Sequence, residues 1–477
     1  MSRFRSLLLP TALAVGLGSV LATPVATAAQ ATPATTAECD TTSTPYNYVV
    51  LYQPQTPQAE VDAELAAKCG SRVAYYPEIG VAVAGSRDAG FADRMGVHRA
   101  YSGSREVAHP ATSEAAAMRA QARAEAEAEN EETVEVVSTA DLSTRQWDMH
   151  MIKAPQANAI DEGSRSVTVG VLDSGIEPTH PALVHALDPA ASAGCNTGAP
   201  DTDPAAWAPT TSDHGTHVAG TIAGKDTERG FTGVAPGVRM ASVKVVNDDG
   251  YIFPEAAVCG FMWAAEHGFE VTNNSYYIDP GMFYCPGRPG DAAAFEAVRR
   301  AVAYSQEKGV LNVAAAGNSG FDLANPPETD PNRQHPVDST CAILPKGLDG
   351  VVTVSAVGYE GTKSSYSNYG TGEVDVTAPG GDRAQLPPGA TSGCVLSSVF
   401  GGQYGTKCGT SMASPHAAGV AALIAGERPG MSPQAVSALL RAKAERVPCG
   451  DAAACTGPAA KNSFYGHGLV DALAAVR

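Results

Sequence analysis

The sequence predicts an α/β protein in which a mostly parallel sheet lies between layers of helices and a small α+β unit precedes it. From Gln146 onward, apolar runs typical of strands alternate with segments of helical periodicity. Such alternation favours parallel strands covered by helices on both faces. This part contains no internal repeat, so a single large domain of about 330 residues is the simplest architecture.

Composition limits the classes of partner. The 477 residues include 50 acidic and 32 basic side chains, which gives a formal net charge of -18. Phosphate backbones and anionic lipids repel such a chain, so nucleic-acid binding and attachment to a membrane surface are disfavoured. Hydrophobic residues make up 44% of the chain, enough to bury a core. Nothing in the sequence marks a partner domain, and we expect a monomer by default.

Residues 1–28 predict a signal peptide. Arg3 and Arg5 precede an apolar run from Leu7 to Ala22, and Ala26-Thr27-Ala28 is a small-x-small pattern suited to signal peptidase. A membrane anchor is the alternative, but the run is shorter than the roughly 20 residues of a spanning helix. We therefore expect a secreted, extracellular protein without a membrane span.

Ten cysteines agree with an oxidising destination, because disulfides persist outside the cytosol. Two precede residue 110 and eight follow it, so we expect each part to close its own bridges. Counting alone leaves the pairing of the eight open, although Cys394 with Cys408 and Cys449 with Cys455 would close short loops. The chain has no CxxC pair, which argues against a zinc ribbon or a thioredoxin-like site.

The small α+β unit is expected over residues 45–109. Its predicted elements are a helix at Gln58–Lys68 and strands at Tyr46–Tyr52, Ser71–Pro77 and Val81–Ala84. Residues 110–145 then combine acidic residues with alanines and lack both apolar periodicity and aromatic side chains. This composition favours a flexible linker over a solvated helix.

The large domain is expected over residues 146–477. Asp291–Lys308 predicts a helix, because Phe295, Val298 and Val302 recur at helical spacing and Gly309 is suited to cap its end. Apolar runs predict strands at Val167–Leu172, Ala241–Val246, Val310–Ala316 and Val351–Val357.

The first candidate site residue is Asp173, which ends the apolar run V-G-V-L-D-S-G. The carboxyl ends of strands in an open parallel sheet face the ligand crevice, so a carboxylate there is suited to an active site. An aspartate that only caps a turn is the alternative.

The second candidate is His214, in the segment D-H-G-T-H-V-A-G-T. A histidine at the first turn of a packed helix is held rigidly while its ring points into a crevice, which suits a general base. A structural role is one alternative. A metal site is another, since His214 and His217 stand at i and i+3, but the segment lacks the carboxylate of an HExxH motif.

The third candidate is Ser411, in G-T-S-M-A-S-P-H-A-A-G, at the start of a helix of small residues. Pro415 is compatible with the first turn of that helix. A serine is a weak nucleophile without an adjacent base. His214 could supply the base, and Asp173 could fix its tautomer and stabilise the imidazolium.

These three segments, in the chain order Asp, His, Ser, resemble the Asp, His and Ser boxes of the subtilisin family of serine peptidases. The resemblance implies a serine endopeptidase that hydrolyses peptide bonds in polypeptide substrates through an acyl-enzyme, with no cofactor required for the chemistry. A fourth family segment is A-A-A-G-N at residues 314–318. By resemblance Asn318 donates its amide to the oxyanion alongside the Ser411 N–H, and the small residues Ala316 and Gly317 leave room for substrate.

The resemblance extends to both ends of the large domain. M-I-K-A-P at residues 151–155 resembles the start of a mature enzyme, and G-H-G-L-V-D at residues 466–471 resembles the turn before a final helix. The 45–109 unit resembles the propeptide that helps these enzymes fold and then inhibits them within the same molecule. A zymogen is therefore implied, with its processing cut between about residues 103 and 147; a folding template suits a parallel sheet, which folds slowly.

The chain departs from the family pattern at several places. Ser275-Tyr276-Tyr277 stands where many relatives have Ser-Leu-Gly beside the substrate backbone, so we expect substrate contact there with an altered specificity pocket. Ala182 replaces a calcium-binding aspartate, and the Lys225–Thr232 loop does not resemble the family's calcium loop. Structural calcium at other sites stays open, and the metal ligands are unknown. Loops at 190–211, 325–345 and 380–404 are longer than in smaller relatives.

Two other functions are alternatives to a peptidase. A catalytically silent binding protein is disfavoured because Asp173, His214, Ser411 and Asn318 are all present. A metal-dependent hydrolase would use His214 and His217, and chelators would then inhibit its chemical step.

Overall fold

The computed structural model describes residues 39–110, 112, 116, 117, 120 and 141–477. The predicted signal peptide at 1–28 and most of the predicted linker at 110–145 lie outside the described residues. Residues Asp40–Arg477 form one compact unit. Within the described part of the chain, no helix has the length and apolar character needed to cross a membrane.

The N-terminal sheet has four antiparallel strands in the order β2-β3-β1-β4. Its strands are β1 (Tyr46–Leu51), β2 (Ser71–Tyr76), β3 (Val81–Ser86) and β4 (Ala100–Tyr101), and its helices are α1 (Gln58–Ala67), α2 (Phe91–Met95) and α3 (Gly103–Ala108). Side chains alternate between the two faces of a strand. Tyr48 and Val50 of β1 accordingly pack with α1, whereas Val49 packs with α9 and α10 of the large domain.

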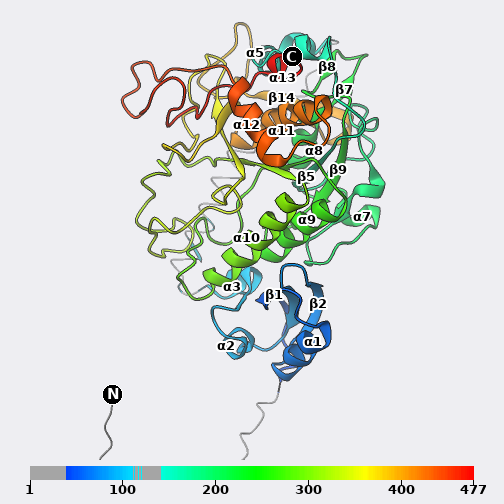
Figure 1. Cartoon of the computed structure of the whole chain (residues 1–477), viewed down its shortest axis with the longest axis vertical. Helices are drawn as coiled ribbons and strands as arrows, with labels where there is room; N and C mark the ends of the chain where they lie inside the picture. The colour runs from blue at the N-terminus through cyan, green and yellow to red at the C-terminus, as the bar shows by residue number, and fades with distance from the viewer. Residues whose placement is uncertain (1–38, 111, 113–115, 118–119, 121–140) are drawn as a thin grey trace, which may run out of the picture. The chain divides into compact units, whose positions relative to one another are not determined.

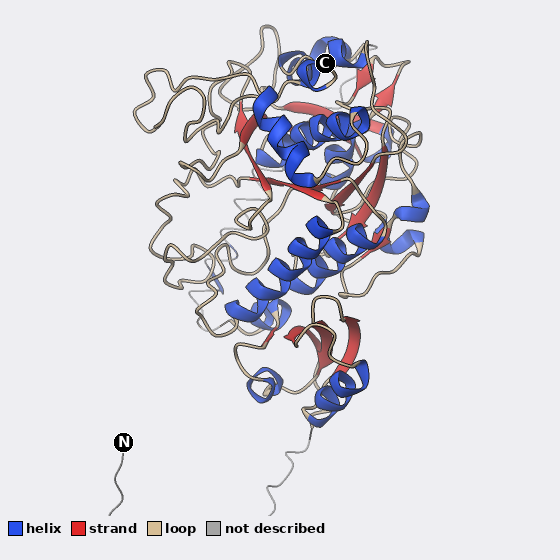
Figure 2. Ribbon diagram, viewed as in Figure 1, coloured by secondary structure: helices blue, strands red, loops and turns tan. Residues whose placement is uncertain are grey.

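The large sheet has seven strands in the order β13-β12-β11-β10-β5-β9-β6, and every neighbouring pair is parallel. The red strands in Figure 2 show this sheet in the middle of the large domain. Its strands are β5 (Thr168–Asp173), β6 (Ala193–Gly194), β9 (Arg239–Lys244), β10 (Val271–Asn274), β11 (Leu311–Ala315), β12 (Val352–Val357) and β13 (Val376–Pro379). Two hairpins complete the strands: β7 (Lys225–Asp226) with β8 (Phe231–Thr232), and β14 (Val395–Val399) with β15 (Gln403–Lys407).

Helices cover both faces of this sheet (Figure 1). One face packs against α8 (His214–Ala223), α11 (Thr410–Glu427) and α12 (Pro433–Lys443), and the other against α9 (Pro254–Glu266) and α10 (Asp291–Glu307). Side chains along β5 alternate between the two cores, with Val169 and Val171 in the first and Leu172 in the second. The shorter helices are α5 (Trp147–Met151), α6 (Ala154–Asn158), α7 (Pro204–Trp207) and α13 (Ala472–Ala475), with 3₁₀ turns at Ser143–Arg145, Pro189–Ala191 and Phe400–Gly402.

The predicted fold class is confirmed, and each helix and strand expected by range lies within two residues of its observed bounds. The elements that the sequence did not single out include β10, β13 and the β14–β15 hairpin. All eight cysteines of residues 146–477 pair among themselves, and both predicted short loops are present. The four bonds are Cys195–Cys259, Cys285–Cys341, Cys394–Cys408 and Cys449–Cys455.

Helix α8 lies unusually close to strand β14. The Ser397 and Ser398 hydroxyls donate to the carbonyls of His217 and Thr216 at 2.7 and 2.8 Å. A Cβ on Gly220, one turn further along α8, would lie 2.3 Å from the Ser398 Oγ. Glycine at this position therefore sets how close the helix that begins at His214 can approach the hairpin.

We predict that Gly220→Ala lowers the free energy of unfolding by about 1–3 kcal/mol, because the added methyl group must displace both serines. Urea titration measures the change. Gly287→Ala is the control, since a Cβ there meets no atom within 4 Å. Equal stability of the two variants would contradict this account of the contact.

Candidate active site

Asp173 and His214 meet at the carboxyl edge of the sheet. Asp173 is the last residue of β5 and His214 is the first residue of α8. The His214 Nδ1 lies 2.8 Å from Asp173 Oδ1, which also accepts the Ser174 backbone N–H at 2.7 Å. The Asp173 side chain is 2% exposed and that of His214 is 15% exposed. A buried carboxylate thus holds an imidazole whose ring still reaches the solvent side.

Ser411 is the second residue of α11, and its Oγ lies 3.4 Å from the Ser275 carbonyl oxygen. Pro415 was expected in the first helical turn, but α11 begins at Thr410, so Pro415 lies one turn further inside. Proline has no N–H to donate to the carbonyl four residues earlier. The carbonyl left without that partner is Ser411 C=O, which accepts the Ser275 hydroxyl at 3.0 Å instead. A hydrogen bond to Ser411 therefore joins the start of α11 to the segment after β10.

Asn318 follows β11, and its side-chain amide has a fixed orientation. The Thr410 backbone N–H and hydroxyl both donate to Asn318 Oδ1, at 2.9 and 2.7 Å. The same hydroxyl accepts the Gly317 N–H at 3.0 Å. Because the amide oxygen is occupied by two donors, the Nδ2 group is directed toward Gly409, where an added Cβ would lie 3.3 Å from it. Asn318 can therefore donate next to the start of α11.

Asn368 supports this arrangement, and the sequence did not reveal it. Its Nδ2 donates to the Ala316 carbonyl at 3.0 Å, while its Oδ1 accepts the backbone N–H groups of Ser319 and Phe321 at 3.1 and 2.9 Å. Gly317 has φ +101°, and a Cβ there would lie 2.5 Å from Asn368 Nδ2. A lone asparagine in a loop gives no motif, so only the folded structure identifies it.

A cavity of about 900 Å³ contains every residue that the sequence assigned to the site. Its lining includes Asp173, His214, Ser275, Tyr276, Tyr277, Ala316, Gly317, Asn318 and Ser411. The segment expected to bind substrate lies directly after β10 rather than within it, so its backbone is free of the sheet's own pairing. Polypeptide in an extended conformation can pair with such a segment.

Tyr277 forms part of an apolar wall of this cavity. It packs in a cluster with Met282, Phe321 and Ile343, all of which line the cavity. Its hydroxyl oxygen accepts the Asn332 Nδ2 group at 3.2 Å. Burial raises the pKa of the Tyr277 phenol, which therefore stays neutral. Asn332 belongs to the long 325–345 loop, so that loop contributes directly to the wall.

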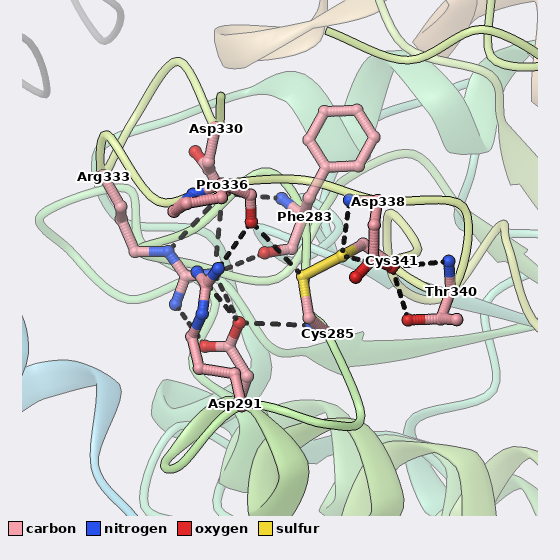
Figure 3. Close-up of a disulfide and its surroundings, with 10 residues drawn as sticks. Phe283, Cys285, Asp291, Asp330, Arg333, Pro336, Asp338, Thr340 and Cys341 are labelled. Atoms are coloured by element: carbon pink, nitrogen blue, oxygen red, sulfur yellow. Dashed lines mark hydrogen bonds and ion pairs between the residues drawn. A yellow bond between two sulfur atoms is a disulfide. The ribbon is translucent and has the colours of Figure 1, made fainter. Parts of the chain in front are cut away.

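Buried charges and a disulfide anchor the 325–345 loop (Figure 3). The Arg333 guanidinium donates to Asp291 Oδ1 at 2.7 Å and to the Phe283 carbonyl, and Asp330 lies 3.5 Å away. The Cys285–Cys341 bond joins the same loop to the segment before α10. Leaving either Arg333 or Asp291 unpaired inside the protein would be costly, so the loop is held firmly where it meets Tyr277.

His214 and His217 do not share a site. The His217 Nε2 lies 3.1 Å from the Val395 carbonyl oxygen, in the contact between α8 and β14, whereas His214 faces Asp173. Burial lowers the pKa of His217 well below its ordinary value, so this ring is neutral. The arrangement gives the metal-hydrolase alternative no converging pair of ligands.

The residues at the family's calcium positions do not fit calcium. Ala182 is fully buried, and the Lys225 ammonium at the start of the β7–β8 hairpin pairs with Glu162 at 2.7 Å. Among the described residues, no group of three or more His, Cys, Asp or Glu side chains is arranged to hold a metal ion. Calcium elsewhere stays a prediction without an assigned site.

Comparison with known proteins decides the family. The sequence profile of the subtilase family matches residues 164–468, more than half of the chain. The chain belongs to the subtilase family. This subtilase is 32% identical to subtilisin DY from Bacillus licheniformis over 336 residues, covering 70% of this chain and 99% of the relative. It is also 32% identical to M-protease from Shouchella clausii, covering 73% of each chain.

A solved structure extends the similarity of fold to the N-terminal sheet. The epidermin leader peptide processing serine protease from Staphylococcus aureus has a TM-score of 0.65 and 22% identity, covering 91% of this chain and 98% of its own. Subtilases are serine-type endopeptidases, so this protein is a serine endopeptidase that acts on polypeptides.

We predict that Thr410→Val lowers kcat about tenfold with little change in KM, because Asn318 loses a hydrogen bond that orients its amide. Steady-state hydrolysis of a peptide substrate separates the two constants. Thr410→Ser, which keeps the hydroxyl group, is the control and should retain most of the activity. A loss of similar size in the serine variant would contradict the orienting role.

Proposed function

We propose that this subtilase is a secreted endopeptidase, made as an autoprocessed zymogen, in which Ser411, His214 and Asp173 form the catalytic triad and Asn318 stabilises the oxyanion. The observation that carries the proposal is the 2.8 Å contact between Asp173 and His214 in the cavity that also contains Ser411 and Asn318. Export is supported by the composition of residues 1–28 and by the disulfides of the large domain.

The chemistry begins with Ser411. Its Oγ exchanges the contact with the Ser275 carbonyl for one with His214 Nε2, attacks the peptide carbonyl and gives up its proton to the imidazole. Asp173 accepts from Nδ1–H, which leaves Nε2 as the basic nitrogen, and stabilises the imidazolium. His214 then returns the proton to the leaving amine.

The oxyanion forms between two donors. The Asn318 Nδ2 group and the Ser411 backbone N–H are directed to the start of α11, where the helix dipole also favours negative charge. Water then repeats the attack on the acyl-enzyme with His214 as base, which releases the acid product and restores Ser411.

The N-terminal sheet acts in this proposal as an inhibitory prodomain. One of its faces is buried against α9 and α10, and Arg300 of α10 donates to the Tyr52 and Ile79 carbonyls at 2.8 and 3.0 Å. After β4 the chain passes the rim of the cavity: a Cβ on Gly103 would lie 3.1 Å from the carbonyl oxygen of Asp279, a lining residue. A cut after this point would free the large domain from a bound, product-like segment.

We predict that Ser411→Ala abolishes peptide hydrolysis and leaves the precursor uncut, because no other group supplies the nucleophile. Intact mass of the secreted protein, before and after a fluorophosphonate reagent, measures both properties. The parent protein should lack its first hundred or so residues and carry one adduct, mapped to Ser411. Normal processing of the purified variant, or an unlabelled processed parent, would overturn the proposal and favour a silent binding protein.

Tyr277 generates a separate prediction about side-chain preference. Tyr277→Gly should raise kcat/KM for peptides with large apolar residues before the scissile bond, because removing the ring enlarges the apolar pocket next to Met282 and Ile343. Tyr277→Phe keeps the ring, loses only the contact with Asn332, and is the control. A panel of peptides that differ at that one residue measures the preference, and an unchanged ranking would contradict this assignment of the pocket.

A further inference from the structure

The surface that carries the prodomain includes a carboxyl group that the catalytic chemistry does not use. Glu255 is the second residue of α9, and its side chain is buried. Its Oε2 atom has no hydrogen-bond partner among the described residues. A buried carboxylate without a partner is costly, whereas a protonated carboxyl group is far less so. The burial of Glu255 without a partner for its Oε2 atom therefore needs a physical explanation.

Glu255 lies next to the contact between the large domain and the prodomain. Gly198 lies between the two parts: a Cβ there would be 2.8 Å from Val83 of β3 and 3.0 Å from the Cβ of Glu255. The Tyr76 hydroxyl of β2 donates to the Gly198 carbonyl at 2.8 Å, and Asn47 of β1 donates to the Thr197 carbonyl at 3.2 Å. The prodomain sheet therefore covers the loop that covers Glu255.

A disulfide holds this loop on α9. Cys195 begins the loop and is bonded to Cys259, one turn beyond Glu255 on the same helix. The loop thus stays on the helix after the prodomain leaves, and only the prodomain side of the cover is removed. Departure of β3 would uncover Gly198, which lies against Glu255 in the first turn of α9, where the helix dipole favours an ionised glutamate.

The elements around Glu255 supply no charge to balance it. Strands β1 and β3 and the loop from Cys195 to Ala199 contain no acidic or basic side chain, and Arg72 of β2 is paired with Asp62 at 2.7 Å. On α10, Arg300 is paired with Glu296 at 2.7 Å and bound to prodomain carbonyls. At the far end of α9 are Glu266 and His267. Burial raises the pKa of Glu255 to about 8.

Glu266 adds to the same effect. Burial raises its pKa, and the prodomain carboxylate Glu78 raises it further across the interface. Like charges across an interface weaken it, so ionisation of Glu266 near Glu78 also opposes prodomain binding. Both acidic groups on α9 therefore favour the bound prodomain when protonated and disfavour it when ionised.

We propose that Glu255 controls prodomain release through its protonation: it is protonated while the sheet lies over the loop that covers it, and its ionisation drives release. The inference rests on the inhibitory role proposed for the prodomain and adds its regulation by pH. A group whose proton is held more tightly in the complex than in the free enzyme stabilises the complex at low pH. That contribution is complete below about pH 4.5, the ordinary pKa of glutamate. It is lost as the pH rises toward about 8, the pKa of Glu255 in the complex.

The test measures prodomain binding without catalysis. The full-length Ser411→Ala protein, with a site for an unrelated peptidase inserted within residues 121–140, is cut and diluted between pH 5 and pH 8.5. Native mass spectrometry then gives the dissociation constant of the prodomain. We expect this constant to rise by up to about tenfold per pH unit between pH 5.5 and 7.5 and to level off above pH 8.

Glu255→Gln in the same background keeps the shape of the protonated acid and cannot ionise. It should bind at least tenfold more tightly than the parent at pH 7.5, with a much smaller pH slope. Glu307→Gln, an exposed change at the end of α10, is the matched control and should follow the parent. Glu255→Met, also without charge, carries the test if the glutamine variant does not fold.

The outcomes separate the two proposals. A prodomain that binds and inhibits, but with the parental pH slope in Glu255→Gln, would overturn the control by Glu255 and leave the inhibitory role standing. A cut prodomain that dissociates at every pH would overturn the inhibitory role itself. A slope that flattens only in Glu266→Gln would assign the control to the Glu266–Glu78 pair and overturn the role of Glu255.

Discussion

The packing of α11 against the parallel sheet is the constraint on which the rest of the site depends. This helix is buried from Met412 to Ile424 and contacts α8 and five strands, which is sterically feasible because most of its residues are alanine, glycine or serine. At Gly419 even a methyl group would lie 2.6 Å from Val234. The close fit fixes the start of the helix, and with it Ser411, relative to the strand ends that carry Asp173 and Asn318.

The sequence correctly predicted where the candidate site residues lie on regular elements. Asp173 ends a strand, His214 begins a helix and Ser411 is the second residue of a helix, and the apolar and small-residue runs of the sequence predicted these positions. The sequence did not predict the contacts that loop residues make with this site. Asn368 orients three backbone groups around Gly317, and Asn332 bonds to Tyr277, from segments that show no periodicity. The position of Pro415 was missed for a related reason: its missing N–H is compensated by Ser275, which lies far away in the sequence.

In the N-terminal sheet too, the sequence predicts the regular elements but not their distant partners. Side chains along β1 alternate between two buried faces, and one face is covered by the unit's own helix α1. The sequence of the unit gives no indication of what covers the other face, because its partners α9 and α10 lie far along the chain and are themselves ordinary amphipathic or buried helices. Specific contacts such as that of Arg300 with the Tyr52 and Ile79 carbonyls become evident only when both surfaces are known.

The prodomain that we propose is an inhibitor within its own enzyme, and such an inhibitor must satisfy two opposite requirements. While the chain is intact, the tether holds the sheet near α9 and α10 at an effective concentration that reaches the millimolar range, so even a moderate interface stays closed. After the linker is cut, the same interface must hold two separate molecules, and dilution opposes it. In the proposed control by Glu255, the buried carboxyl group weakens the interface only when it loses its proton, so separation would depend on the pH of the medium.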